Sequence, residues 1–186
     1  MTLEELWELF PIVLTEHRPW WRGWFEEESA KLKEALPAEW SARISHIGST
    51  AVDSIWAKPI VDILVEAGGR EALDSLKPAI VLCGYTLMSS SEERASFNKG
   101  YTPGGYDERV FHLHLRNWGD NDELYFRDYM NEYPEAAREY ERLKLTLWKE
   151  YEHDRDGYTE RKGELVRKYT QKALVRYGDR YRRQGE

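Results

Sequence analysis

The stretch HIGSTAVDSIWAKPIVDILVEA, residues 46–67, decides how the rest of the chain is interpreted. A short apolar run ends at the pair Gly48 and Ser49, and thirteen residues after Ser49 a second apolar run contains one carboxylate, Asp62. Side chains two residues apart lie on the same face of a strand. Asp62, Leu64 and Glu66 are therefore predicted to share one face of a strand whose other face is entirely apolar.

Periodicity and turn residues predict a helix–sheet–helix order along the chain. A first helix is expected between Pro19, which favours a helix start, and the helix-breaking Pro37. Strands are expected at 43–49, 59–67, 85–89, 93–102 and 109–117, and further helices at 70–84, 121–133, 134–151 and 157–178. The sequence TPGGYD, residues 102–107, predicts the turn of an antiparallel hairpin. This order predicts an α+β fold with a mixed sheet, helices on one face and a C-terminal helical segment.

Composition limits the class of protein. A chain of 186 residues is predicted to form one domain, 1–186, with a core over about residues 20–175. The net charge of −7 argues against nucleic acid or an anionic membrane as the main partner. The first residues lack the pattern of a signal peptide, and no apolar window is long enough to span a membrane. A cytoplasmic location is expected.

The predicted strand 109–117 carries a second set of polar side chains. His112 and His114 share one face of that strand, and its opposite face is apolar. If the sheet places these two polar faces together, Asp62, His112 and His114 converge in one cleft. Two imidazoles and one carboxylate form a ligand set that suits Fe, Mn, Ni or Zn rather than Mg alone. The alternative is that the histidines only form hydrogen bonds with their neighbours.

Several separate motifs, in this order, resemble the pattern of the GrpB family: HIGSTAV, AKPIVDILV, FNKG, FHLHL, FRDYM, EYERLK and DRDGYTERK. The likeness runs from about residue 20 to about residue 175. It implies a compact version of the nucleotidyltransferase fold, which is the polymerase-β-like architecture. The family's activity is not established, so the resemblance implies a fold more firmly than a function.

The nucleotidyltransferase pattern implies a role for each end of the opening stretch. Gly48, Ser49 and Thr50 match the turn that holds a phosphate chain, and Gly48 would permit a close approach of the phosphate to the backbone. Asp62 matches the acid that binds a divalent ion. Active members of that fold carry a second acid two residues on, where this chain has Leu64. Glu66 is the candidate replacement, although it is expected near the end of the strand.

Other candidate residues have a structural interpretation beside the functional one. Lys58 could reach a phosphate at the mouth of the cleft, or it could be a solvated lysine. Asn98 and Lys99 could contact a base or ribose, or they could simply be polar residues of an edge strand. His46 is expected to be structural. Arg127 and Asp128 are expected to form an ion pair.

The C-terminal helices offer four more candidates. Asp154, Arg155, Tyr158 and Lys162 could close over the cleft, at a distance that cannot be derived from the sequence. The basic C-terminal end is expected to be a solvated tail.

Two hypotheses about function follow. The first is a metal-assisted enzyme of a transferase-like kind that acts on a nucleotide or another phosphorylated small molecule. Asp62, His112 and His114 would be its catalytic residues and would hold Mg, Mn or Zn. The resemblance also implies a link to coenzyme A metabolism, because some relatives are fused to a dephospho-CoA kinase. The second is a catalytically degenerate module that binds nucleotides or other proteins.

Overall fold

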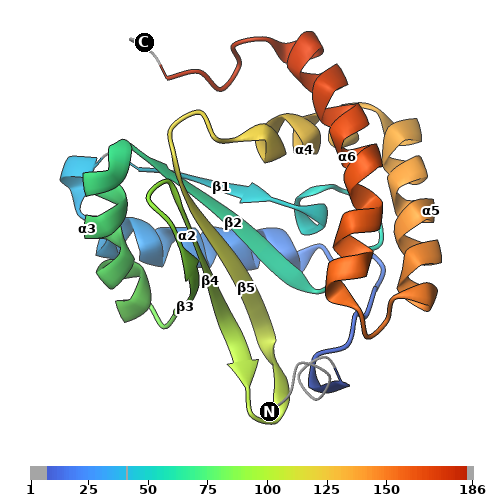
Figure 1. Ribbon diagram of the computed structural model, residues 1–186, viewed down its shortest axis with the longest axis horizontal. Coiled ribbons are helices and arrows are strands. Elements are labelled where there is room, and N and C mark those ends of the chain that lie inside the picture. Colours follow the sequence, from blue (N-terminus) through green and yellow to red (C-terminus); the bar gives the residue numbers. More distant parts are fainter. Residues whose placement is uncertain (1–7, 41, 184–186) are drawn as a thin grey trace.

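A mixed five-stranded sheet forms the centre of the protein (Figure 1). The computed structural model describes residues 8–40 and 42–183, apart from the side chain of Arg155. In chain order the elements are α2 (Trp20–Ala35), η1 (Ala38–Trp40), β1 (Arg43–Ile47), η2 (Ser49–Ala51), β2 (Ile60–Ala67), α3 (Gly69–Leu82), β3 (Thr86–Ser90), β4 (Arg94–Thr102), β5 (Gly105–Asn117), α4 (Asp122–Glu132), α5 (Pro134–Glu150) and α6 (Arg155–Tyr177).

The sheet has the strand order β1-β2-β5-β4-β3. β2 pairs antiparallel with β1 and parallel with β5, whereas β5 pairs antiparallel with β4, and β4 with β3. The predicted hairpin over 93–117 is therefore confirmed. The 3-10 helix η2 leads from β1 toward β2 and contains Ser49 and Thr50 of the predicted turn. The predicted α+β class with a mixed sheet is also confirmed.

The apolar face of the sheet packs against α2 and α3. Val61, Ile63 and Leu113 have no exposed surface and belong to the same core cluster as Leu32 of α2 and Leu76 of α3. The alternate apolar side chains of β2 and β5 therefore pack against the apolar sides of two amphipathic helices. This burial is the main source of stability for the sheet.

The opposite face of the sheet is covered in part by the C-terminal helical segment. Leu64 is fully buried and packs with Ile47 of β1, Leu124 of α4 and Tyr181. Figure 1 shows α4, α5 and α6 gathered at one side of the sheet. The helices thus do not lie on one face alone, because the polar face also carries an apolar position that has to be buried.

The last helix begins two residues before its predicted start. The Asp154 carboxylate accepts a hydrogen bond from the Gly157 N–H at 2.9 Å and caps the helix N-terminus. This cap satisfies a backbone donor that the first turn leaves unpaired.

Of the described helices, none combines the length and the apolar character that a membrane span requires.

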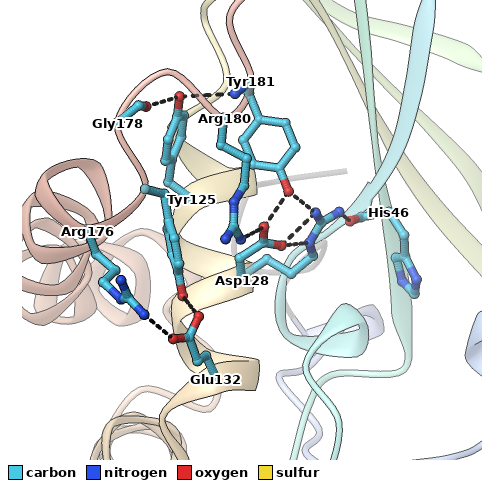
Figure 2. A network of polar contacts seen from close by, with 10 residues as sticks. His46, Tyr125, Asp128, Glu132, Arg176, Gly178, Arg180 and Tyr181 are labelled. Carbon is cyan, nitrogen blue, oxygen red and sulfur yellow. Dashed lines mark hydrogen bonds and ion pairs between the residues drawn. The ribbon is translucent and has the colours of Figure 1, made fainter.

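A polar network joins the end of the chain to α4 and β1 (Figure 2). The predicted ion pair between Arg127 and Asp128 is confirmed, with 2.7 Å between Nη2 and Oδ1. Arg127 also donates to the backbone carbonyl of His46 at 2.8 Å and to the Tyr181 hydroxyl at 2.8 Å. Asp128 in turn accepts from Tyr181 and from Arg180. The network holds α4 against the edge strand β1.

Glu66 has a structural role. Its side chain has no exposed surface and accepts two hydrogen bonds from the Arg43 guanidinium, at 2.7 and 2.8 Å. Asn121 Nδ2 donates to it at 2.8 Å and the Gly119 N–H at 3.3 Å. A buried carboxylate requires this compensation. Glu66 is thus fully engaged between β1, β2 and the segment before α4.

We expect Arg43→Met to lower the free energy of unfolding by about 3–5 kcal/mol, because it leaves a buried carboxylate without its cation. Urea denaturation measures the loss. The double variant Arg43→Met/Glu66→Gln should recover part of it, since the neutral amide can still accept from Asn121 and Gly119. A double variant no more stable than Arg43→Met would show that the unpaired charge is not the cause.

Candidate functional site

Asp62, His112 and His114 lie together on the polar face of the sheet. Parallel pairing of β2 with β5 sets Asp62 beside His112, and Leu64 beside His114. Asp62 Oδ1 is 3.5 Å from His112 Nδ1 and 3.5 Å from His114 Nε2. The side chains of these three residues are 27%, 20% and 28% exposed. The convergence that the two polar faces predict is therefore present in the structure.

The two histidines keep Asp62 ionised. Burial acts to raise the pKa of the Asp62 carboxyl, but the hydrogen bonds and charges of His112 and His114 outweigh it and hold the pKa well below its usual range. The acid therefore carries its negative charge throughout the physiological pH range. This is why a single acid is tolerated in a largely buried strand.

A tyrosine that no sequence pattern indicated completes the contacts of His112. The Tyr101 hydroxyl lies 2.7 Å from His112 Nε2, and the two rings are nearly parallel. Tyr101 follows an irregularity in the pairing of β4 with β5 between Lys99 and Tyr101. At this point Gly100 has φ +88°, and a Cβ there would lie 2.2 Å from the Arg109 carbonyl oxygen. Simple alternation along the strand cannot predict the position of a residue that follows such a shift.

Gly48 brings the end of β1 against the acid. It has φ +73° and ψ −173°, a region that residues with a Cβ rarely adopt. A Cβ at this position would lie 2.4 Å from Asp62 Oδ2. The glycine is thus required by the Asp62 carboxylate, whereas the family pattern implied that it makes room for a phosphate.

A cavity of about 230 Å³ opens beside Asp62 and His112. It lies between the sheet, η2 and the helices α5 and α6. Its lining residues are Ser49, Thr50, Lys58, Ile60, Asp62, His112, Lys144, Tyr158, Thr159 and Lys162. Of the predicted residues, the cavity thus brings together Ser49, Thr50, Lys58, Asp62 and His112 with the helical candidates Tyr158 and Lys162. We call it the Asp62 cavity.

Three lysines share this cavity. Lys58 Nζ and Lys162 Nζ lie 4.6 and 4.3 Å from the centre of the Tyr158 ring, so both cations contact the same aromatic side chain. Lys144 is 2% exposed and donates a hydrogen bond to the Trp56 carbonyl oxygen. Burial, together with the charges of Lys162 and Lys58, lowers the pKa of Lys144 to about 7, although Glu141 acts in the opposite direction. A bound anion would stabilise the protonated form of such an amine and so raise its pKa.

Two of the predicted ligand contacts lie elsewhere. Lys99 Nζ pairs with the buried Glu28 carboxylate of α2 at 2.5 Å, on the side of the sheet that α2 and α3 cover. Asn98 pairs with His112 in the sheet, but it lines a different cavity of about 320 Å³ along β4. Neither residue lines the Asp62 cavity. Lys99 lies on the opposite face of the sheet, and β5 separates Asn98 from β2.

The positions that could supply a second acid are both engaged in packing or ion pairing. Leu64 is buried in an apolar cluster, and Glu66 is bound by Arg43, Asn121 and Gly119. Glu66 is therefore held by other partners and does not line the Asp62 cavity, which argues against its replacing the missing acid. Among residues 8–40 and 42–183, no group of three or more His, Cys, Asp or Glu side chains is arranged to hold a metal ion.

Comparison with known proteins establishes the family. The family described as GrpB protein matches residues 11–172. The chain belongs to the GrpB family. The UPF0157 protein YqkA of Bacillus subtilis is 32% identical over 150 residues, which cover 79% of this chain. This GrpB chain spans 43% of the length of YqkA and 65% of a Pseudomonas aeruginosa relative, UPF0157 protein PA4798.

Solved structures agree with the family and with the fold. A crystal structure of the conserved protein GrpB from Enterococcus faecalis superimposes with a TM-score of 0.76 at 32% identity, over 89% of this chain and 99% of that one. The Cid1 poly(U) polymerase superimposes with a TM-score of 0.50 at 11% identity, over 80% of this chain and 47% of that one. The second likeness shows that this GrpB protein has a nucleotidyltransferase-like fold.

We expect Gly48→Ala to be more destabilising than Gly69→Ala. Both glycines have positive φ, but a Cβ at Gly69 meets nothing within 4 Å. Gly69→Ala should therefore report the backbone strain alone, about 1–3 kcal/mol, whereas Gly48→Ala adds the collision with Asp62. Denaturant unfolding measures both. The excess should shrink in an Asp62→Ala background, and an excess that persists unchanged there would contradict the role assigned to Gly48.

Proposed function

We propose that this protein binds a phosphorylated small molecule, such as a nucleotide, through the Asp62 cavity. The observation that carries the proposal is the set of three lysines, Lys58, Lys144 and Lys162, that line one cavity beside a single acid. Phosphate oxygens would offset the mutual repulsion of these cations. The hydroxyls of Ser49 and Thr159 add neutral donors to the same wall.

The size of the cavity limits which part of the ligand it can hold. Its volume of about 230 Å³ is below the range of roughly 300–1,000 Å³ that is usual for whole drug-sized ligands. It therefore suits a phosphate chain whose remaining part extends outward. The Cid1 poly(U) polymerase was solved with MgGTP bound, and the shared fold favours a nucleotide among the phosphorylated compounds.

A divalent ion is part of the proposal only as a companion of the ligand. Two ligands of one tetrahedral ion, each about 2.0–2.2 Å from it, stand roughly 3.4 Å apart. The distances of 3.5 Å from Asp62 Oδ1 to His112 Nδ1 and to His114 Nε2 match that spacing. The three side chains do not form a complete centre as they stand. Asp62 and His112, which line the cavity, would thus supply only part of a coordination shell, and phosphate oxygens would supply the rest. A carboxylate and an imidazole suit Mn or Zn better than Mg.

Two functions remain within this proposal. A metal-assisted enzyme would transfer part of the phosphorylated ligand, whereas a binding module would hold the ligand unchanged. The burial of Leu64 and the engagement of Glu66 favour the binding module, because two-metal phosphoryl chemistry usually needs several anionic ligands. The two are separated by turnover.

We expect ATP to bind the wild type and Lys162→Ala to weaken it about tenfold or more, since one charge-assisted contact to phosphate is lost. Lys172→Ala is the matched control, because Lys172 is exposed on the same helix and does not line the cavity. Calorimetry in EDTA, and then with Mg, Mn or Zn, measures the affinity. In Asp62→Asn and in His112→Ala, the gain in ATP affinity that metal produces should disappear, whereas the affinity in EDTA should stay as in the wild type.

The outcomes distinguish the alternatives. ATP converted to product only when metal is present indicates the enzyme, and binding without conversion indicates the module. Absence of binding by ATP, dephospho-CoA and pyrophosphate under all these conditions would contradict the proposal. Equal affinity in wild type and Lys162→Ala would place the ligand outside this cavity.

We expect the affinity for ATP to fall as pH rises from about 7.5 to about 9. The phosphate groups are already fully ionised in this range, because their second pKa is about 6. The group whose charge changes is therefore Lys144. The folded protein lowers the pKa of Lys144 from 10.5 to about 7, so the amine is mostly neutral above pH 7. Binding of an anion to the charged amine then requires uptake of a proton, and the free energy of that uptake becomes less favourable as pH rises. Lys144→Met should bind more weakly near pH 7.5 and show a flatter pH profile. Equal slopes in both proteins would contradict the involvement of Lys144.

A further inference from the structure

A larger cavity, of about 600 Å³, lies on the other side of η2 from the Asp62 cavity. It opens between α2, β1 and the α4 side of the molecule, and its volume is in the usual range for small-molecule sites. The residues that matter for its chemistry are His17, Arg22, Phe25, His46, Thr50 and Arg127. We call it the α2–β1 cavity.

A flat aromatic pair forms part of its wall. The rings of Phe25 and His46 are stacked, with centroids 4.9 Å apart and an angle of 12° between the planes. Burial lowers the pKa of His46 to about 4, although the Asp62 charge acts against this. The imidazole is therefore neutral near pH 7, and a further flat ring can extend the stack without a charge being buried.

The charges of this cavity are balanced within the protein. Arg22 pairs with Glu26 at 3.2 Å, and the Arg127 guanidinium donates hydrogen bonds to Asp128, to the Tyr181 hydroxyl and to the His46 carbonyl. The Asp62 cavity, in contrast, has three lysines beside one acid. The α2–β1 cavity thus suits an uncharged ligand, whereas the Asp62 cavity suits an anion.

One polar atom of the wall has no partner. His17 Nδ1 is buried and makes no hydrogen bond within the described part of the chain. The other ring nitrogen, Nε2, is 3.9 Å from Asp53 Oδ1. A buried polar atom without a partner is costly. Because this nitrogen has almost no accessible surface, the His17 ring would have to turn before a ligand could exchange a hydrogen bond with it and remove that cost.

From these observations we propose that the α2–β1 cavity is a second binding site, for an uncharged compound with a flat ring and hydrogen-bonding groups. A free nucleoside is the simplest compound of this class. The site does not depend on phosphate binding in the Asp62 cavity. The ring would stack on the Phe25 and His46 pair, and a polar group of the ligand would pair with His17 Nδ1 once the His17 ring has turned toward it.

The two cavities meet at one residue. Thr50 lines both of them, and its Oγ1 lies 3.0 Å from His46 Nε2. A ligand in the α2–β1 cavity therefore lies next to the turn, Ser49–Ala51, that borders the Asp62 cavity. This placement suits a second substrate or an effector of the same protein.

Adenosine is the probe for this site, with ribose as the control that lacks a flat ring. We expect adenosine to shift the backbone amide signals of Phe25 and His46 in nuclear magnetic resonance spectra, and ribose to leave them unchanged. Phe25→Leu should weaken adenosine at least about tenfold, because an aliphatic side chain keeps volume but cannot stack. Lys162→Ala, which alters only the Asp62 cavity, should leave the affinity for adenosine unchanged.

A second variant tests the site by a different interaction. His17→Phe keeps a ring of similar size and removes Nδ1, so it should also weaken adenosine while the melting temperature confirms a folded protein. The proposal is overturned if adenosine, guanosine and uridine at millimolar concentration shift none of these signals. It is equally overturned if Lys162→Ala abolishes adenosine binding, or if both cavity variants fold and bind adenosine as the wild type does.

Discussion

The space between residue 48 and residue 62 has room for only one side chain, and the Asp62 carboxylate fills it. The Asp62 carboxylate occupies the position that a Cβ on residue 48 would take, so the chain after β1 passes directly over the acid. The same carboxylate contacts His112 and His114 of the neighbouring strand β5. Because burial alone would disfavour the charge, these contacts are what permit an ionised acid at the centre of the sheet. The turn, the acid and the histidines thus depend on one another.

The polar face of β2 divides its positions among three tasks. Asp62 borders a cavity, Leu64 packs under α4, and Glu66 ties β1 to the segment before α4 through Arg43 and Asn121. The alternation of side chains places all three on one face, yet their surroundings differ completely. In this chain one acid of that face borders the cavity, and the two neighbouring positions serve packing and ion pairing.

The helices of the C-terminal segment give the site its positive charge. α5 contributes Lys144 and α6 contributes Lys162, and together with Lys58 they surround the cavity beside Asp62. On the other side of η2 the charges are paired and an aromatic stack forms the wall. Thr50 lies between these two environments. The proposed anion and the proposed neutral ring would thus lie on opposite sides of one turn.

Local pattern in the sequence determined the elements and the face on which each polar residue lies. Period-two alternation placed Asp62 on one face of β2, and His112 with His114 on one face of β5, because that periodicity follows from backbone geometry alone. The parallel pairing of β2 with β5 then brought the two faces together. The Gly-Ser turn and the proline-bounded helix α2 follow from similarly local rules. Only the tertiary structure decided which distant residues meet these faces. Lys144 reaches the Asp62 cavity through the packing of α5, Lys99 pairs with Glu28 on the opposite face of the sheet, and Tyr101 contacts His112 after a shift in strand pairing. Such contacts depend on how helices and strands far apart in the sequence pack together, and no local period encodes that packing.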